Sequence, residues 1–128
     1  MISLLFVNLI FACQLLTGSW VNELGSVANI RAHAKTGQLD GDYTTAVGTA
    51  SGPYPLLGTY VRDSCESTFG FSVTWDKPSA RGNSTTTWSG IFLNGTLYTT
   101  WLLTAQVQSA ADVWQATRIG TNVFYRAK

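Results

Sequence analysis

Two alternating, threonine-rich segments flank an Asn-Gly pair between residues 84 and 105, and this arrangement restricts the fold more than any other feature of the chain. Asn-Gly is favoured at the centre of a two-residue turn between antiparallel strands, because both central residues need a positive φ angle. With Asn94 and Gly95 as the turn, Trp88 pairs with Trp101. The two indoles should therefore lie opposite each other on one face of a sheet.

Side chains alternate along strands, so the composition of each face of this hairpin can be read directly. The face of the tryptophan pair carries Thr86, Trp88, Gly90, Phe92, Leu97, Thr99, Trp101 and Leu103. The opposite face carries Ile91, Leu93, Tyr98 and Leu102, which is unusually apolar for a surface in water. An aromatic pair that fills a core and one that lines a binding site both fit this hairpin, and the apolar outer face favours packing between subunits.

Short β-prone runs follow one another along the chain, separated by Gly, Pro, Asn and Ser. This spacing predicts strands over residues 19–24, 27–34, 39–47, 55–62, 67–76, 85–93, 96–105 and 116–126. Only residues 107–114 are expected to form a helical turn. About eight such strands can close into a barrel without exposed edges. We therefore predict an all-β fold, an eight-stranded antiparallel up-and-down β-barrel spanning residues 16–126 as one domain.

Charge and composition exclude several kinds of partner. Charged residues make up 12% of the chain, against about 25% in an ordinary soluble domain, while hydrophobic residues make up 45%. Self-association is the simplest way to cover such a surface, and aggregation is the alternative. The net charge of +1 gives no electrostatic basis for binding nucleic acid or an anionic membrane.

Residues 1–12 ("MISLLFVNLIFA") form an apolar stretch too short to span a bilayer as a helix and typical of a signal peptide. No Lys or Arg precedes it, so a truncated or non-native leader is the alternative. Secretion would allow one disulfide between Cys13 and Cys65, unless Cys13 is removed with the leader. Asn83 and Asn94 each begin an Asn-x-Ser/Thr tripeptide, the acceptor for glycosylation in secreted proteins.

The sequence gives little support to catalysis or metal binding. The single histidine, His33, does not form a zinc site with two distant cysteines. A Ser-His-Asp triad would have to use His33, which lies in a strand-like run without a nucleophile-elbow motif. Most carboxylates fall in predicted turns, where Asp commonly bends or caps the backbone. We therefore expect no enzymatic activity and no metal site.

Neutral polar side chains recur on the same strand faces as large apolar ones. Alternation groups Asn22 with Leu24 and Ser26, Tyr43 with Thr45 and Val47, and Asn122 with Gly120 and Phe124. Buried polar groups are unfavourable unless they are hydrogen-bonded. Such groups either satisfy one another or, beside four tryptophans, line a site for a small neutral ligand with a polar head.

Six segments closely resemble, in order, the avidin and streptavidin family of biotin-binding proteins. They are "TGSWVNELGS", "GDYTTAV", "TFGFSVTW", "TTTWSG", "TTWLLT" and "DVWQATRIGTNVF", and the resemblance extends from about Leu16 to Arg126. It implies a secreted homotetramer of eight-stranded barrels, each holding one biotin as a bound ligand rather than as a catalytic cofactor.

The resemblance also implies a role for each matching residue. Donors to the ureido oxygen are Asn22, Ser26 and Tyr43, and acceptors for the ureido N–H groups are Thr45 and Asn122. Thr86 lies near the thioether, and Gly48, Thr49, Ala50 and Ser84 surround the valerate carboxylate. The walls comprise Trp75, Trp88 and Trp101 together with Leu24, Val47 and Leu103. Trp114 corresponds to a tryptophan that enters the site of the neighbouring subunit.

Some positions depart from the family pattern. Asn122 is the neutral variant of a position that is Asp in streptavidin, which should weaken acceptance of the ureido N–H slightly. Thr49 lies at a variable position, a glycan on Asn83 would lie at the mouth of the site, and Cys65 has no counterpart at the avidin disulfide. Two other functions remain open on the residues alone: a lipocalin-like barrel for another hydrophobic molecule, and a structural role with the site occluded.

Overall fold

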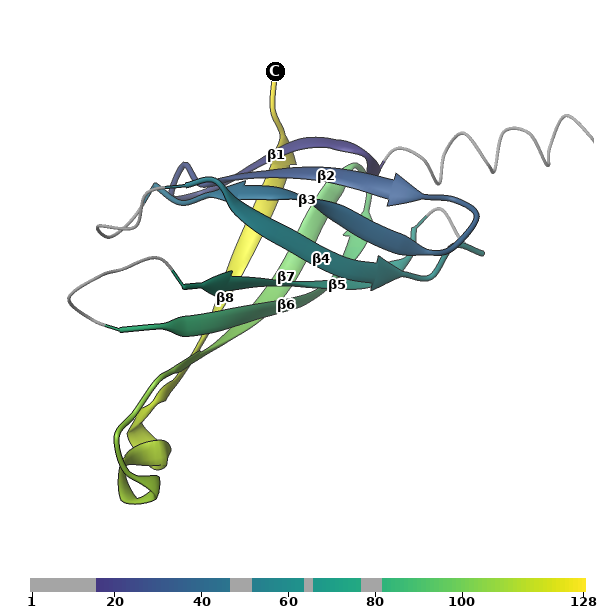
Figure 1. Cartoon of the computed structure of the whole chain (residues 1–128). Coiled ribbons are helices and arrows are strands. Elements are labelled where there is room, and N and C mark those ends of the chain that lie inside the picture. Colours follow the sequence, from purple (N-terminus) through teal and green to yellow (C-terminus); the bar gives the residue numbers. More distant parts are fainter. Residues whose placement is uncertain (1–15, 47–51, 64–65, 77–81) are drawn as a thin grey trace, which may run out of the picture.

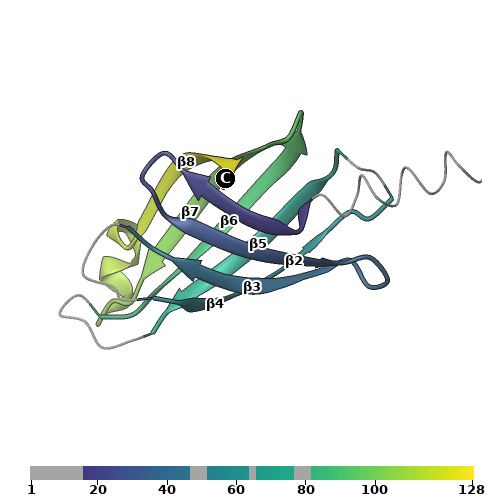
Figure 2. The same ribbon diagram turned by 90° about the horizontal axis from the view of Figure 1, so that it is seen from above.

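Eight strands form a closed barrel in the computed structural model, which describes residues 16–46, 52–63, 66–76 and 82–128. Each strand pairs antiparallel with its neighbours in the chain, and β8 returns to pair with β1 (Figures 1 and 2). The strands are β1 (Gly18–Asn22), β2 (Val27–His33), β3 (Gln38–Thr44), β4 (Tyr54–Tyr60), β5 (Thr68–Trp75), β6 (Ser84–Leu93), β7 (Thr96–Ala105) and β8 (Thr117–Arg126). The predicted up-and-down β-barrel is confirmed.

The hairpin of β6 and β7 has the register that its sequence predicts. Asn94 and Gly95 adopt φ angles of 53° and 76°, and Trp88 pairs directly with Trp101. The backbone N–H of Asn94 donates to Oε2 of Glu66 at 2.9 Å, which ties this turn to the segment before β5. The turn therefore follows from local conformational preference, because both positive φ angles fall on residues that tolerate them.

Strand ends lie within two residues of the predicted ones except in β3, which ends at Thr44 rather than at residue 47. The difference that most affects the candidate site follows β1. The strand stops at Asn22, whose carbonyl accepts from the N–H of Gly25 at 3.0 Å as the chain turns. Leu24 consequently lies in the turn and is 55% exposed, so the expected inner face of Asn22, Leu24 and Ser26 is broken at its centre. The predicted helical turn is a 3₁₀ helix, η2 (Ala110–Gln115).

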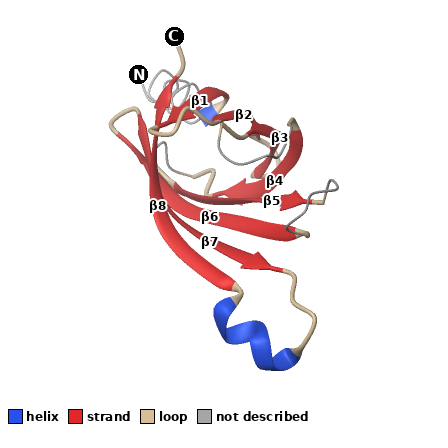
Figure 3. Ribbon diagram, turned by 90° about the vertical axis from the view of Figure 1, so that its left-hand side faces the viewer, coloured by secondary structure: helices blue, strands red, loops and turns tan. Residues whose placement is uncertain are grey.

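The barrel has two ends of different character. We call the "η2 end" the one at which β1, β3, β5 and β7 finish, and the "hairpin end" the one with the Asn94–Gly95 turn. Figure 3 shows η2 projecting beyond β7 and β8. Towards the hairpin end, the ring of Trp20 packs edge-on against Phe92, with centroids 5.7 Å apart, and its Nε1 donates to the carbonyl of Leu16 at 2.9 Å. Ser67 is also buried here, and its carbonyl accepts from the backbone N–H of Phe92 at 3.0 Å.

Several sequence predictions fall outside the described residues: the signal peptide at 1–12, Cys13, Cys65, and the candidate site residues Val47, Gly48, Thr49 and Ala50.

Within the described ranges, none of the helices has the length and apolarity to cross a bilayer. On the outer wall, the apolar side chains of the hairpin are exposed as expected, including Leu93, Tyr98 and Leu102.

Candidate functional site

Asn22, Ser26 and Tyr43 meet at the η2 end, inside the barrel. Oδ1 of Asn22 accepts from the backbone N–H groups of Leu24 and Ser26, each at 3.0 Å. Its Nδ2 donates to the hydroxyl of Tyr43 at 3.3 Å. Because two backbone donors occupy Oδ1, the amide cannot rotate without losing both bonds, and Nδ2 is held towards the interior. Asn22 is thereby fixed as a hydrogen-bond donor.

Ser26 and Tyr43 are both buried beside this amide. Oγ of Ser26 accepts from the backbone N–H of Ala46 at 3.0 Å, which leaves its hydroxyl hydrogen to donate elsewhere. Burial raises the pKa of Tyr43, and hydrogen bonds from Ser26 and Asn22 offset only part of the rise. The phenol therefore stays protonated at neutral pH and keeps a proton to donate.

Asn122 is the corresponding acceptor and lies on β8, the strand that pairs with β1. Its Oδ1 accepts from Nε1 of Trp88 at 3.0 Å, and its Nδ2 donates to Oε1 of Glu23 at 2.7 Å. Its backbone carbonyl accepts from the hydroxyl of Thr99 at 2.8 Å. A carboxylate can only accept and an indole N–H can only donate, so the two partners fix the amide with Oδ1 beside Trp88. The oxygen keeps a second lone pair for another donor.

Aromatic rings pack around these polar groups. Trp75 lies edge-on to both Tyr43 and Tyr54, with centroids 5.6 and 4.9 Å away, and its Nε1 donates to Oγ1 of buried Thr86 at 2.8 Å. Trp88 stacks on Phe71 at 5.0 Å. The indole N–H groups of Trp75 and Trp88 thus each orient a polar side chain of the candidate site. The rings and the polar groups therefore form one connected unit.

Trp101 lies over a glycine on the adjacent strand. Gly120 of β8 pairs directly with it, and a Cβ atom at Gly120 would lie 2.3 Å from Cζ2 of the indole. The indole therefore occupies the space that any larger residue would need. Leu103, two residues further along β7, is half-buried and pairs with Thr86.

The remaining predicted site residues are placed less centrally. Thr45 follows β3 and is half-buried, and Ser84 begins β6 opposite Trp75. Trp114 lies on η2 and is 80% exposed, so its indole does not contribute to the interior of its own barrel. Nine of the predicted residues are thus gathered at the η2 end within one interior: Asn22, Ser26, Tyr43, Trp75, Thr86, Trp88, Trp101, Leu103 and Asn122.

Sequence reasoning missed several contributors. Phe71, Tyr54 and Thr99 contact the site residues directly, and each lies on a strand face that alternation already places inside. Glu23 carried no such signal, because its neighbour Asn22 points inward and alternation would send Glu23 outward. Its role depends on the turn that ends β1, which sequence spacing does not reveal.

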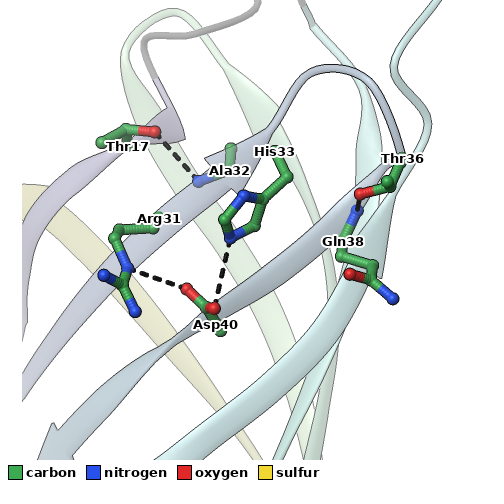
Figure 4. A network of polar contacts seen from close by, with 7 residues as sticks. All are labelled: Thr17, Arg31, Ala32, His33, Thr36, Gln38 and Asp40. Carbon is green, nitrogen blue, oxygen red and sulfur yellow. Dashed lines mark hydrogen bonds and ion pairs between the residues drawn. The ribbon is translucent and has the colours of Figure 1, made fainter.

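The groups gathered here are mainly amides, hydroxyls and aromatic rings. They offer neutral donors and acceptors among indole rings, and within the described ranges no group of three or more His, Cys, Asp and Glu side chains is placed to hold a metal ion. His33 lies towards the hairpin end, where its Nε2 contacts Asp40 at 3.2 Å beside Arg31 on the outer surface (Figure 4). That cluster is exposed and is remote from the polar groups described above. Among the described residues, every buried side-chain nitrogen and oxygen has a hydrogen-bond partner.

Comparison with known proteins identifies one family along most of the chain. The sequence model described as "Avidin family" matches residues 11–127. Avidin-related protein 4/5 from Gallus gallus is 41% identical over 119 residues, which cover 87% of this chain and 77% of the relative. Avidin from Gallus gallus is 40% identical over 123 residues, which cover 88% of this chain and 78% of avidin. Avidin-related protein 3 from the same organism is 39% identical over 121 residues, covering 88% and 78%. The chain therefore belongs to the avidin family.

Proposed function

We propose that this protein binds biotin non-covalently and without catalysis, one molecule per barrel, at the η2 end. The observation that carries the proposal is the opposite orientation of two amides. Asn22 is held with its Nδ2 facing inward by two backbone N–H groups, and Asn122 is held with its Oδ1 beside Trp88. A urea needs both, because its oxygen accepts while its two nitrogens donate.

The proposed contacts follow from this arrangement and from the family. The ureido oxygen accepts from Asn22, Ser26 and Tyr43, and three converging donors stabilise partial negative charge on it. One ureido N–H donates to Asn122, and the other to Thr45. Trp75, Trp88 and Trp101 enclose the bicyclic ring, with Leu103 beside them and Thr86 near the sulfur. The carboxylate end is assigned to Ser84 together with Gly48, Thr49 and Ala50, and Val47 completes the walls. Leu24, which is 55% exposed in the turn after β1, is assigned to the rim of the site.

Retention on immobilised biotin, followed by titration calorimetry with free biotin, tests the proposal. We expect retention, elution by free biotin and a fluorescence change from the tryptophans around the site. Asn122→Ala should weaken binding, whereas Asn29→Ala is a matched control, because Asn29 lies on β2 and bonds to Asp42 on the outer wall at 2.8 Å. A folded wild-type chain that ignores biotin but takes up a fatty acid or a retinoid would refute the proposal.

We also propose that the site is completed by a second copy of the chain in a homotetramer. Trp114 is 80% exposed on η2, none of whose residues is buried, and Ile119 on the adjacent strand is 70% exposed. An indole so placed is available to a neighbouring barrel. Trp114→Ala should speed dissociation of biotin while leaving the barrel folded, as followed by stopped-flow fluorescence and by light scattering for subunit number. Unchanged dissociation in the variant would contradict the shared site.

Secretion is proposed on the apolar segment at residues 1–12 and on the family resemblance. Expression in a secreting cell should yield a mature chain in the medium, and mass spectrometry of its N-terminus and of Asn83 and Asn94 would identify the cleavage position and any glycans. Retention of the whole chain in the cell would argue against it.

A further inference from the structure

Glu23 makes two hydrogen bonds across the closure of the barrel, although it lies in an exposed turn. Its Oε1 accepts from Nδ2 of Asn122 at 2.7 Å, and its Oε2 accepts from the backbone N–H of Val123 at 3.0 Å. These partners are about a hundred residues away in the sequence and belong to β8. Both carboxylate oxygens are thus directed at the residue that supplies the acceptor of the site and at its neighbour.

We propose that Glu23 is a positioning residue for ligand recognition, which holds the Asn122 amide in its accepting orientation and strengthens Oδ1 as an acceptor. This inference rests on the proposed function, in which Oδ1 accepts a ureido N–H of biotin. A carboxylate has no hydrogen to donate, so it bonds the Nδ2 side of the amide and never the Oδ1 side. The opposite flip would bring two acceptor oxygens together at 2.7 Å.

The charge on Glu23 adds to the geometry. A hydrogen bond from an amide N–H to a carboxylate is shorter and stronger than a neutral one, and it draws electron density through the amide towards Oδ1. Burial raises the pKa of Glu23, but the hydrogen bonds from Asn122 and from the backbone N–H groups of Glu23 and Val123 outweigh it and hold that pKa below its usual value. Tyr43 is the titratable neighbour whose ionisation is coupled to this charge. The hydrogen bond from Asn122 to the charged carboxylate of Glu23 thus gives a neutral amide part of the accepting strength of a carboxylate.

The first test compares biotin affinity in Glu23→Ala and Glu23→Gln with wild type. We expect a loss of about tenfold for Glu23→Ala, and a smaller loss for Glu23→Gln, since the glutamine oxygen still accepts from Asn122 but carries no charge. Glu66→Gln is the matched control, because Glu66 also accepts from a backbone N–H in a turn, at 2.9 Å, but lies at the hairpin end. Equal affinity in all four proteins would overturn the inference and leave biotin binding itself intact.

A second experiment, in the Asn122→Asp variant, separates a positioning role of Glu23 from a role that only holds β1 and β8 together. Asn122→Asp places two carboxylates in contact and should weaken binding. Adding Glu23→Gln to Asn122→Asp should then restore affinity, because the glutamine Nε2 donates to the introduced carboxylate. The same substitution thus lowers affinity in one background and raises it in the other. A residue that only closed the wall would act with the same sign in both, and that result would refute the proposal.

A third measurement needs no ligand. The indole N–H of Trp88 donates to Oδ1 of Asn122, so its ¹H and ¹⁵N chemical shifts report the accepting strength of that oxygen. Glu23→Gln should shift this resonance and Glu66→Gln should not. If the wild-type chain fails to bind biotin, the proposed function fails, and the Trp88 shift alone decides whether Glu23 orients the amide. An unmoved resonance would refute the inference whatever the ligand.

Discussion

Replacing Gly120 by alanine tests whether the indole of Trp101 is held by the absence of a side chain opposite it. A Cβ atom at this position would lie 2.3 Å from Cζ2, 2.6 Å from Cε2 and 2.9 Å from Nε1 of Trp101. Real carbon atoms do not approach so closely, so the indole or the strand must move. Overpacking of this kind destabilises a protein by about 1–3 kcal/mol. Alanine also lowers the backbone entropy of the unfolded chain, which offsets about 0.4–1 kcal/mol of this destabilisation. We expect a net loss of about 1–2 kcal/mol in the free energy of unfolding.

A double-mutant cycle isolates this clash. Urea unfolding, followed at one fixed protein concentration by circular dichroism, is measured for Gly120→Ala, Trp101→Leu and the double variant. Leucine lacks the atoms that the new methyl group would meet, so Gly120→Ala should be neutral or slightly stabilising in that background. A coupling energy of about 1–2 kcal/mol is expected. If Gly120→Ala costs the same in both backgrounds, the strain is not at the indole and the argument fails.

Biotin affinity should follow the same pattern, because the displaced indole is one wall of the proposed site. Gly120→Ala alone should weaken binding, as measured by calorimetry. In the Trp101→Leu background it should cause no further weakening. A Gly120→Ala variant with unchanged affinity and an unchanged fluorescence spectrum would indicate that Trp101 keeps its place.

Three further perturbations test separate parts of the structure. Trp88→Phe keeps an aromatic ring but removes the donor to Asn122. The free energy of unfolding in urea should therefore fall by about 1–3 kcal/mol, and a fall of less than about 1 kcal/mol would contradict a structural role for the N–H. Gly95→Ala should lower the free energy of unfolding by about 1 kcal/mol through the positive φ angle alone, since no atom lies within 4 Å of the new carbon. Asn94→Gly should be tolerated, and equal losses of stability from the two substitutions would refute the role of the φ angle. The hydrogen bond from His33 is the largest influence on the pKa of Asp40 and lowers it; burial opposes this, and Arg31 adds to the lowering. The stabilisation from Asp40 is therefore present above 3.8 and lost as the pH falls below it. The thermal midpoints of wild type and Asp40→Asn should therefore differ slightly at pH 7 and converge at acid pH, and a gap that widens on acidification would reverse the sign.

Much of this architecture was accessible from the sequence because it depends on local signals. The Asn94–Gly95 turn fixed the register of β6 and β7, and alternation then placed Trp88 and Trp101 opposite each other, as the structure confirms. The closed barrel followed from eight short strands and the need to avoid free edges. These rules involve neighbouring residues or a single repeated spacing, so they survive without knowledge of tertiary contacts.

The candidate site was predictable only in part. Alternation correctly put Asn22, Tyr43 and Asn122 inside, but it continued β1 too far and placed Leu24 with them. Glu23 was missed because its partners lie on β8, and no local pattern links a turn residue to a strand so distant in the chain. Long-range hydrogen bonds from turns are decided by how the barrel closes, which a single sequence does not state.

The closure between β1 and β8 is the shortest ladder in the wall. It joins only residues 20–22 to residues 124–126, whereas β6 and β7 pair along their whole length. A side chain fastens each end of this ladder: Arg126 donates to the carbonyl of Thr17 at one end, and Glu23 accepts from Val123 at the other. Local opening of a protein begins where cooperative pairing is least extensive. Separation of β1 from β8 would break the hydrogen bonds of Glu23 and free the Asn122 amide in the same event. We therefore expect release of a ligand from the proposed site to be coupled to local opening of the barrel between these two strands.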